Sequence, residues 1–167
     1  MILTGFQLRG ARKALNLTLD KLSKSCEVSK TTLIRLEKNT DNLDYIKCYP
    51  SDIEKIYDFF IKQSLTFFNK NIISLNLTIE SKSLDNNLTR FQFIVSRTAI
   101  NLSHRELEKF INLSYGALRK FETKDNLYYL QSYKLPISDI INVFHKFGIS
   151  YPDNLSVELN ENTCTQQ

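Results

Sequence analysis

The chain has 167 residues, of which 42% are hydrophobic and 24% are charged, as in an average globular protein. This composition excludes collagen-like, mucin-like and wholly disordered chains. With only four glycines and three prolines, it favours helices over the many tight turns of a β-sandwich or barrel. The net charge of +4 and the isoelectric point of about 8.9 are mildly basic, so they indicate nucleic-acid binding only if the charge is concentrated.

No segment has the pattern of a membrane span, a secretion signal or a metal site. No stretch approaches the ~18 uninterrupted apolar residues that a membrane span requires. The first six residues lack a basic stretch followed by an apolar one, so we expect no signal peptide. The cysteines and histidines are far apart and include no CxxC pair: Cys26, Cys48, Cys164, His104 and His145. We therefore expect no metal, no cofactor, no disulfide framework and a cytoplasmic protein with reduced thiols.

An internal repeat organises the chain. Residues 3–37 and 88–122 align without gaps, and thirteen of these thirty-five positions are identical. Self-similarity of this kind indicates two copies of one structural unit, each of about 70–75 residues. The sequence therefore predicts a first domain over residues 1–77, a polar linker over 78–87, a second and more divergent domain over 88–160, and a frayed tail over 161–167.

Each copy has the pattern of a series of short helices. Thr18 and Ser29 precede apolar-periodic segments and are expected to cap the helices that follow. Residues 103–106 (Ser-His-Arg-Glu) and residues 51–54 (Ser-Asp-Ile-Glu) have the spacing of capping boxes, so each predicts a helix start. Gly148 is expected to end the last helix, which we place from residue 138.

A short segment of alternating apolar residues follows the last helix of each copy. Residues 65–75 and residues 149–159 both resemble two strands around an Asn- or Asp-rich turn. An isolated hairpin is marginally stable in water, so we expect these hairpins to pack on the helices or on each other. The predicted fold is mainly α, with a short β-hairpin after each helical domain.

Residues 17–37 carry a more specific pattern. A polar cap is followed by an inward-facing leucine, a tight turn ending in Val-Ser, and a helix ending in Leu-Glu. This segment resembles the helix-turn-helix of the Cro/cI (XRE) family of lambda-repressor-like DNA-binding proteins, and residues 102–122 repeat it. The resemblance implies two tandem lambda-repressor-like domains that bind double-stranded DNA, with recognition helices at about 29–38 and 114–123.

Such a pair of helices can place the second one in the major groove, which is about 12 Å wide. Residues at the start of that helix then face base edges, while capping hydroxyls and free N–H groups face phosphates. The alternative interpretation is that these side chains only form the solvated face of a helix. The candidate DNA-binding residues are Thr18, Ser29, Lys30, Thr31, Thr32, Arg35 and Lys38 in the first copy and Ser103, Ser114, Tyr115, Arg119 and Lys120 in the second.

The positive charge is concentrated in these two segments. Residues 1–40 carry a net charge of +5 and residues 86–124 carry +4, while the rest of the chain is net acidic. Clustered lysine and arginine are typical of surfaces that face phosphates.

The resemblance also implies two ion pairs, Arg12 with Glu37 and Arg97 with Glu122. In the family, an arginine of the first helix pairs with a glutamate at the end of the recognition helix. Both copies keep both partners, so we assign these four residues to orienting the recognition helix and not to contacting bases. Removing one partner of a buried pair costs about 3–5 kcal/mol, because the other charge is left unpaired.

The sequence departs from the family pattern in several places. The turn between the two helices usually holds glycine, whereas this chain has Glu27 and Asn112. The second recognition helix contains Gly116 and fewer groups that could contact bases, so the second copy is either a divergent reader or a unit kept for packing or dimerisation. His104 is expected as an exposed first residue of a helix, with a phosphate contact as the alternative. Tyr128, Tyr129 and Tyr133 are expected to pack in the core and loops, with a stacking platform for bases as the alternative.

These patterns bear on three classes of function. A DNA-binding transcriptional regulator, cytoplasmic and associated with the nucleoid, agrees with most of them. A protein-interaction module, antitoxin-like or adaptor-like, that uses the same fold and the hairpin edges is the alternative. We expect no enzyme and no catalytic residues, because GxGxxG, Walker, GxSxG and HExxH motifs are absent from the sequence. A homodimer and a protein partner stay open, and neither a membrane partner nor a small-molecule effector site is indicated.

Overall fold

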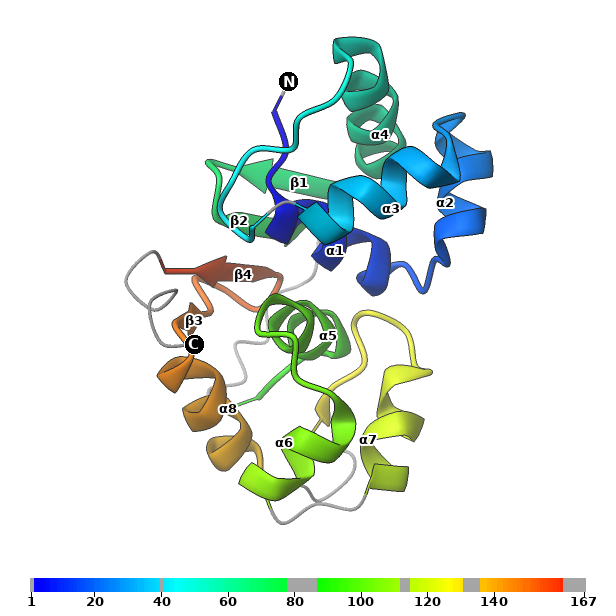
Figure 1. Ribbon diagram of the computed structural model, residues 1–167. Coiled ribbons are helices and arrows are strands. Elements are labelled where there is room, and N and C mark those ends of the chain that lie inside the picture. The colour runs from blue at the N-terminus through cyan, green and yellow to red at the C-terminus, as the bar shows by residue number, and fades with distance from the viewer. Residues whose placement is uncertain (1, 40, 78–86, 112–114, 131–135, 161–167) are drawn as a thin grey trace. The chain divides into compact units, whose positions relative to one another are not determined.

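The computed structural model describes residues 2–39, 41–77, 87–111, 115–130 and 136–160 (Figure 1). The chain divides into two compact units, Met1–Leu77 and Thr78–Gln167, and each unit is described by itself. Of the predicted linker 78–87, only Asn87 is among the described residues, and the predicted tail 161–167 lies outside them.

Four helices make up most of the described part of the first unit. They are α1 (Gly5–Ala14), α2 (Leu19–Cys26), α3 (Lys30–Asn39) and α4 (Pro50–Lys62). α3 packs against α1 and α2, and α2 also packs against α4. The centre of the unit is formed by apolar side chains that are fully buried: Phe6, Leu22, Leu33, Ile56 and Phe60.

The described part of the second unit repeats this order of elements. Its helices are α5 (Arg90–Ala99), α6 (His104–Phe110), α7 (Tyr115–Glu122) and α8 (Ile137–Lys146). The fully buried side chains lie at corresponding places: Phe91, Leu107, Leu118, Ile140 and Phe144. α3 and α7 lie within one residue of the predicted spans 29–38 and 114–123. Ser114 and Asn112 are outside the described residues.

The starts of the helices follow from capping groups in the sequence. Thr4 and Gln7 form a capping box at α1, because each side chain accepts a hydrogen bond from the other residue's backbone N–H. Thr89 caps α5 in the same way with Gln92. Ser103 and Glu106 cap α6, as the sequence predicts.

Two helix starts differ from the prediction. The capping box expected at residues 51–54 is wrong, because α4 begins at Pro50 with Tyr49 as the N-cap residue and has no side-chain cap. Proline suits the first helical position, since its φ is already helical and its missing N–H would be unsatisfied there anyway. Ser51 therefore lies inside the first turn. α8 begins at Ile137, directly after Pro136, and not at residue 138.

Each unit ends in a pair of short antiparallel strands. β1 (Leu65–Phe68) pairs with β2 (Ile72–Leu75), with Leu65 opposite Leu75. β3 (Ile149–Ser150) pairs with β4 (Ser156–Leu159), with Ile149 opposite Leu159. The first hairpin packs on α1 and α4, and the second on α5 and α8.

A glutamine of the first helix holds the turn of each hairpin. The Gln7 side-chain amide donates to the carbonyl oxygens of Asn69 at 2.9 Å and Ile72 at 3.1 Å. The Gln92 amide donates in the same way to the carbonyl of Asp153 at 2.7 Å. The fold is thus mainly helical, with a small antiparallel β part in each unit. Among the described helices, none has the length and apolar character that crossing a membrane would require.

Candidate nucleic-acid interface

A tight turn joins α2 to α3 in the first unit. α2 ends at Cys26, and Glu27 adopts the left-handed conformation with φ 54° and ψ 36°. A residue other than glycine pays roughly 1–2 kcal/mol for this conformation. Val28 is buried below the turn, and its carbonyl accepts a hydrogen bond of 2.7 Å from the Ser23 hydroxyl. The turn therefore sets the direction of α3 relative to α2.

Two hydroxyl groups cap these helices on the exposed side. The Thr18 side chain accepts a hydrogen bond of 3.2 Å from the backbone N–H of Lys21. The Ser29 hydroxyl accepts one of 3.0 Å from the N–H of Thr32 and shares a 2.8 Å hydrogen bond with the Thr32 hydroxyl. Thr18 and Ser29 are exposed, as phosphate contacts must be, while Thr32 is half-buried and engaged with the cap.

α3 has one apolar face and one basic face. Leu33 and Leu36 are buried, while Lys30, Thr31, Ile34, Arg35 and Lys38 are exposed. At about 100° per residue, these five exposed side chains span an arc of about 140°. Among the described side chains of α3, no exposed one is acidic. Four of the predicted site residues, namely Lys30, Thr31, Arg35 and Lys38, therefore share one surface.

The contacts that the structure describes for Lys30 and Arg35 on this face are weak. Lys30 Nζ lies 2.8 Å from a carboxylate oxygen of Asp20, but the two side chains are 49% and 62% exposed. An exposed ion pair of this kind contributes about 0–1 kcal/mol. Arg35 Nη1 donates to the Lys47 carbonyl oxygen over 3.4 Å, which is long for a hydrogen bond. A phosphate or a base edge could replace either contact at little cost.

The one carboxylate of α3 is turned away from this surface. Arg12 of α1 binds both oxygens of Glu37, with Nε at 2.5 Å and Nη2 at 2.6 Å. Its third nitrogen, Nη1, donates to the Leu17 carbonyl oxygen at 2.7 Å. Both side chains of the pair are about 10% exposed. The predicted pair of Arg12 with Glu37 is present in the structure, and its bidentate geometry fixes the last turn of α3 against α1.

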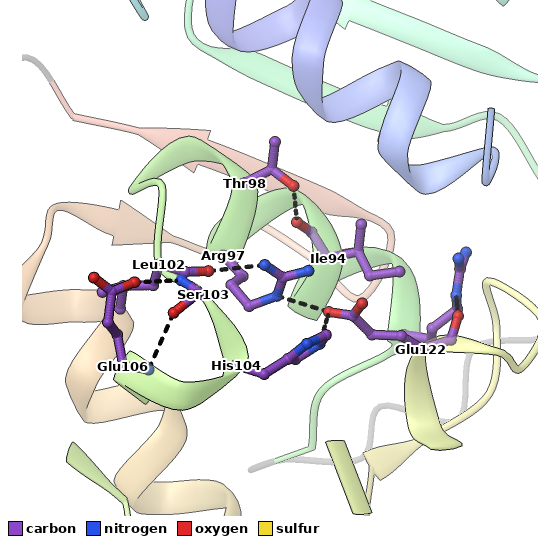
Figure 2. A network of polar contacts seen from close by, with 9 residues as sticks. Ile94, Arg97, Thr98, Leu102, Ser103, His104, Glu106 and Glu122 are labelled. Carbon is purple, nitrogen blue, oxygen red and sulfur yellow. Dashed lines mark hydrogen bonds and ion pairs between the residues drawn. The ribbon is translucent and has the colours of Figure 1, made fainter. Parts of the chain in front are cut away.

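The corresponding pair of the second unit has an additional member (Figure 2). Arg97 Nε lies 2.7 Å from Glu122 Oε1, and Arg97 Nη1 donates to the Leu102 carbonyl oxygen at 2.8 Å. His104 Nε2 lies 2.9 Å from the same Glu122 oxygen. Burial raises the pKa of Glu122, but the hydrogen bonds from His104 and Arg97 outweigh it, so this pKa is below its ordinary value.

His104 therefore differs from both sequence-based expectations. Its side chain is 18% exposed and is directed at Glu122, so it is neither a solvated helix start nor a group free to contact phosphate. The reason is its place in the fold: the first residue of α6 lies beside the last residue of α7. The first copy has Leu19 at the aligned position, and the gapless alignment could have suggested a change of role there.

The exposed face of α7 is less basic than that of α3. Arg119 and Lys120 are exposed, and so is Gly116, while Leu118 and Phe121 are buried. Ser103 is exposed and closes the capping box of α6. Its hydrogen bonds lower the pKa of Glu106. Tyr115 is the first residue of α7, but its side chain, like Ser114, is outside the described part of the structure.

One group that holds α3 was not predicted from the sequence. Arg9 donates from Nη1 to the Glu37 carbonyl oxygen at 2.8 Å and from Nη2 to Asn42 Oδ1 at 2.7 Å. In the second unit, Arg90 donates from Nε to the Glu122 carbonyl oxygen at 2.9 Å and also binds Asn126 Oδ1. These contacts could be inferred from the sequence only indirectly, because the repeat alignment pairs neither Arg9 nor Arg90 with another arginine.

Comparison of the chain with protein-family models, curated proteins and solved structures gave no match. Within the residues that the structure describes, no group of three or more His, Cys, Asp and Glu side chains is placed to hold a metal ion. The α2–α3 and α6–α7 surfaces are therefore the candidate site of the described part of the chain.

Proposed function

We propose that the chain is a sequence-specific DNA-binding transcriptional regulator of the Cro/cI (XRE) lambda-repressor-like kind, with one such domain in each unit. The observation that carries this proposal is the basic exposed face of α3, from which Glu37 has been withdrawn into a buried ion pair. The turn at Glu27 presents that face beside the capped start of α2. An α-helix held in this way suits the major groove of double-stranded DNA.

The proposed roles follow from the chemistry of each exposed group. Lys30 and Arg35 donate to guanine acceptors, and Thr31 contacts a base edge with its hydroxyl or methyl group. Ile34, which is 42% exposed, packs on a thymine methyl group. Lys38 neutralises a phosphate. Thr18 and Ser29, which cap α2 and α3, contact phosphates of the DNA backbone on either side of the base contacts.

In this proposal, the second unit contributes less to sequence-specific recognition than the first. Arg119 and Lys120 give α7 two exposed cations, which suffice for phosphate contacts but offer less base discrimination. Ser103, Ser114 and Tyr115 complete the proposed contacts at the start of α6 and α7. A regulator of this kind works in the cytoplasm on the nucleoid, and it controls transcription by occupying its site, alone or with a protein partner.

The test is DNA binding by the full chain and by a paired variant. A duplex selected from a random pool is titrated in fluorescence anisotropy at several salt concentrations, beside an unrelated duplex of equal length. We expect Lys30→Ala with Arg35→Ala to weaken binding of the selected duplex about a hundredfold, because two base contacts are lost. The control variant Lys62→Ala with Lys146→Ala removes the same net charge from exposed helix ends. Its affinity for the selected duplex is expected to stay within about twofold of the wild-type value. Binding without salt dependence, or equal loss in both variants, would refute the proposal.

The second candidate, a protein-interaction module, is favoured by one observation. Phe110 is 57% exposed, and its ring lies 6.0 Å from that of Phe147, which is 37% exposed. In the first unit, Ser25 aligns with Phe110, and Gln63 takes the C-cap place of Phe147. Exposed paired aromatics are typical of protein contacts. This candidate predicts a protein complex that survives Lys30→Ala with Arg35→Ala and is lost in Phe110→Ser with Phe147→Gln.

A further inference from the structure

In each unit, a second guanidinium group, besides that of Arg12 or Arg97, holds the C-terminal end of α3 or α7. In the first unit it belongs to Arg9, the fifth residue of α1. It donates to the Glu37 carbonyl oxygen at 2.8 Å and to Asn42 Oδ1 at 2.7 Å. The last carbonyl groups of a helix have no partner within the helix, so the Glu37 carbonyl is an acceptor that needs a donor from elsewhere.

The second unit has the same two acceptors but takes its donor from another position. Arg90, the first residue of α5, donates to the Glu122 carbonyl oxygen at 2.9 Å and binds Asn126 Oδ1. Glu122 aligns with Glu37, and Asn126 occupies the place of Asn42, since their carbonyl oxygens accept from Phe91 and Phe6 respectively.

The arginine has therefore moved between the two copies while its target has stayed. The alignment pairs Arg90 with Gly5 and Arg9 with Ile94, so each copy lacks arginine where the other has it. The two positions are four residues apart, which is about one turn along the same face of the helix. A guanidinium that served only as a solvated charge would have no reason to meet the same carbonyl and the same amide from a different turn.

We propose that Arg9 and Arg90 are equivalent positioning residues, each of which fixes the end of the DNA-facing helix to the first helix of its unit. This inference rests on the proposed DNA-binding function. In the first unit, Glu37 is then held at its carboxylate by Arg12 and at its carbonyl by Arg9. Two rigid points on α1 thus set the direction in which α3 presents Lys30 and Arg35, although Arg9 itself touches no base.

The experiment converts the first unit of the full chain to the arrangement of the second. Three variants are compared with the wild type: Arg9→Ile, Arg9→Ile with Gly5→Arg, and Asn42→Ala. The last one removes one acceptor of Arg9 and leaves Arg9 and Arg90 in place. DNA affinity and its salt slope are measured with the selected duplex. Hydrogen exchange of the backbone amides in the last turn of α3 is measured without DNA.

We expect Arg9→Ile to weaken binding about tenfold and Asn42→Ala to weaken it less, both with an unchanged salt slope, because no phosphate contact is lost. Adding Gly5→Arg restores affinity to within about twofold and restores slow exchange in α3. The restored variant also shows that a loss in Arg9→Ile is not general unfolding.

Three results would overturn the inference: unchanged affinity and exchange in Arg9→Ile, a salt slope lower by about one, which would make Arg9 a phosphate contact, or no recovery with Gly5→Arg. If no duplex is bound with salt dependence by the wild type, the proposed function fails. The exchange data then still decide whether the two arginines are equivalent, so the two failures are distinguishable.

Discussion

At the scale of single residues, the ion pairs of the acidic groups around α3 determine how accessible its basic face is to a ligand. Glu37 belongs to α3 itself, but Arg12 holds it in a pair that is about 10% exposed. Asp20 of α2 instead forms an exposed ion pair with Lys30, in which the Asp20 side chain is 62% exposed and the Lys30 side chain 49%. The first pair orients the helix, whereas the second competes directly with any phosphate or base for Lys30.

Removing this competitor gives a prediction about affinity. Replacing Asp20 by Asn is expected to raise DNA affinity about two- to fivefold, because Lys30 no longer exchanges a carboxylate for a DNA contact. The unfolding free energy should change by less than about 1 kcal/mol, since the lost pair is exposed. Fluorescence anisotropy and chemical denaturation measure the two quantities.

The matched control for Asp20→Asn is Glu54→Gln, which removes the same charge from an exposed position on α4. An increase in affinity that is equal in both variants would mean that only the net charge matters. In that case, Lys30 would not be in the interface.

Glu122 gives a prediction about pH. Its pKa in the folded protein lies below the ordinary value, so the carboxylate contributes stability above the unfolded-state pKa of about 4.3 and loses it as the pH falls through the folded-state pKa. We expect Glu122→Gln to be less stable than the wild type at pH 7, and the difference in unfolding free energy to narrow as the pH falls below about 5 and through the folded-state pKa. Urea denaturation across this range measures it.

Glu54→Gln is also the control for this experiment, because Glu54 is an exposed carboxylate. Its variant should follow the wild type at every pH. A constant difference between Glu122→Gln and the wild type from pH 7 to pH 3 would contradict the assigned role of the Glu122 charge.

At the scale of elements, α7 is the shorter counterpart of α3, with 8 residues against 10. Gly116 lies in its first turn, and apart from the adjacent residues and the backbone of α7 itself, no atom of the described structure lies within 4 Å of the place where a Cβ would stand. Gly116→Ala is therefore expected to raise the unfolding free energy by about 0.5–1 kcal/mol, because alanine loses less backbone entropy than glycine in a helix. The reverse change one residue on, Ala117→Gly, should lower it by a similar amount. A destabilised Gly116→Ala protein in thermal unfolding would contradict this account of α7.

Most helix boundaries could be predicted from the sequence because their signals are local. Thr18, Ser29 and the Ser103 box each stand directly before a helix, and each side chain makes the capping bond expected of it. The box predicted at residues 51–54 failed for an equally local reason, since the neighbouring Pro50 already sets the first helical position.

The contacts that hold α3 and α7 could be predicted only in part. The pairs of Arg12 and Arg97 have glutamate partners that repeat in both copies, so the sequence carries a signal for them. The target of Arg9 is a backbone carbonyl, which every residue has, so no residue type marks it. His104 joins Glu122 only through the packing of α6 on α7, which the sequence pattern does not specify.

At the scale of the whole molecule, the two compact units share one order of helices and strands but have unequal surfaces. The basic segments 1–40 and 86–124 carry net charges of +5 and +4, but α3 presents three exposed cations and the described part of α7 presents two. In the second unit, an exposed aromatic pair stands where the first unit has polar residues. The proposal therefore assigns base discrimination to the first unit and general phosphate contact to the second.

The claim that the exposed face of α3 contacts duplex DNA is tested most directly by an NMR titration of the full chain. Amide chemical shifts of the 19.5 kDa protein are followed while the selected duplex is added. The account predicts that the largest changes fall on residue 18 and on residues 29–38, with smaller ones on residues 116–120. It is contradicted if the duplex leaves residues 29–38 unchanged, or if the changes centre on Phe110 and Phe147.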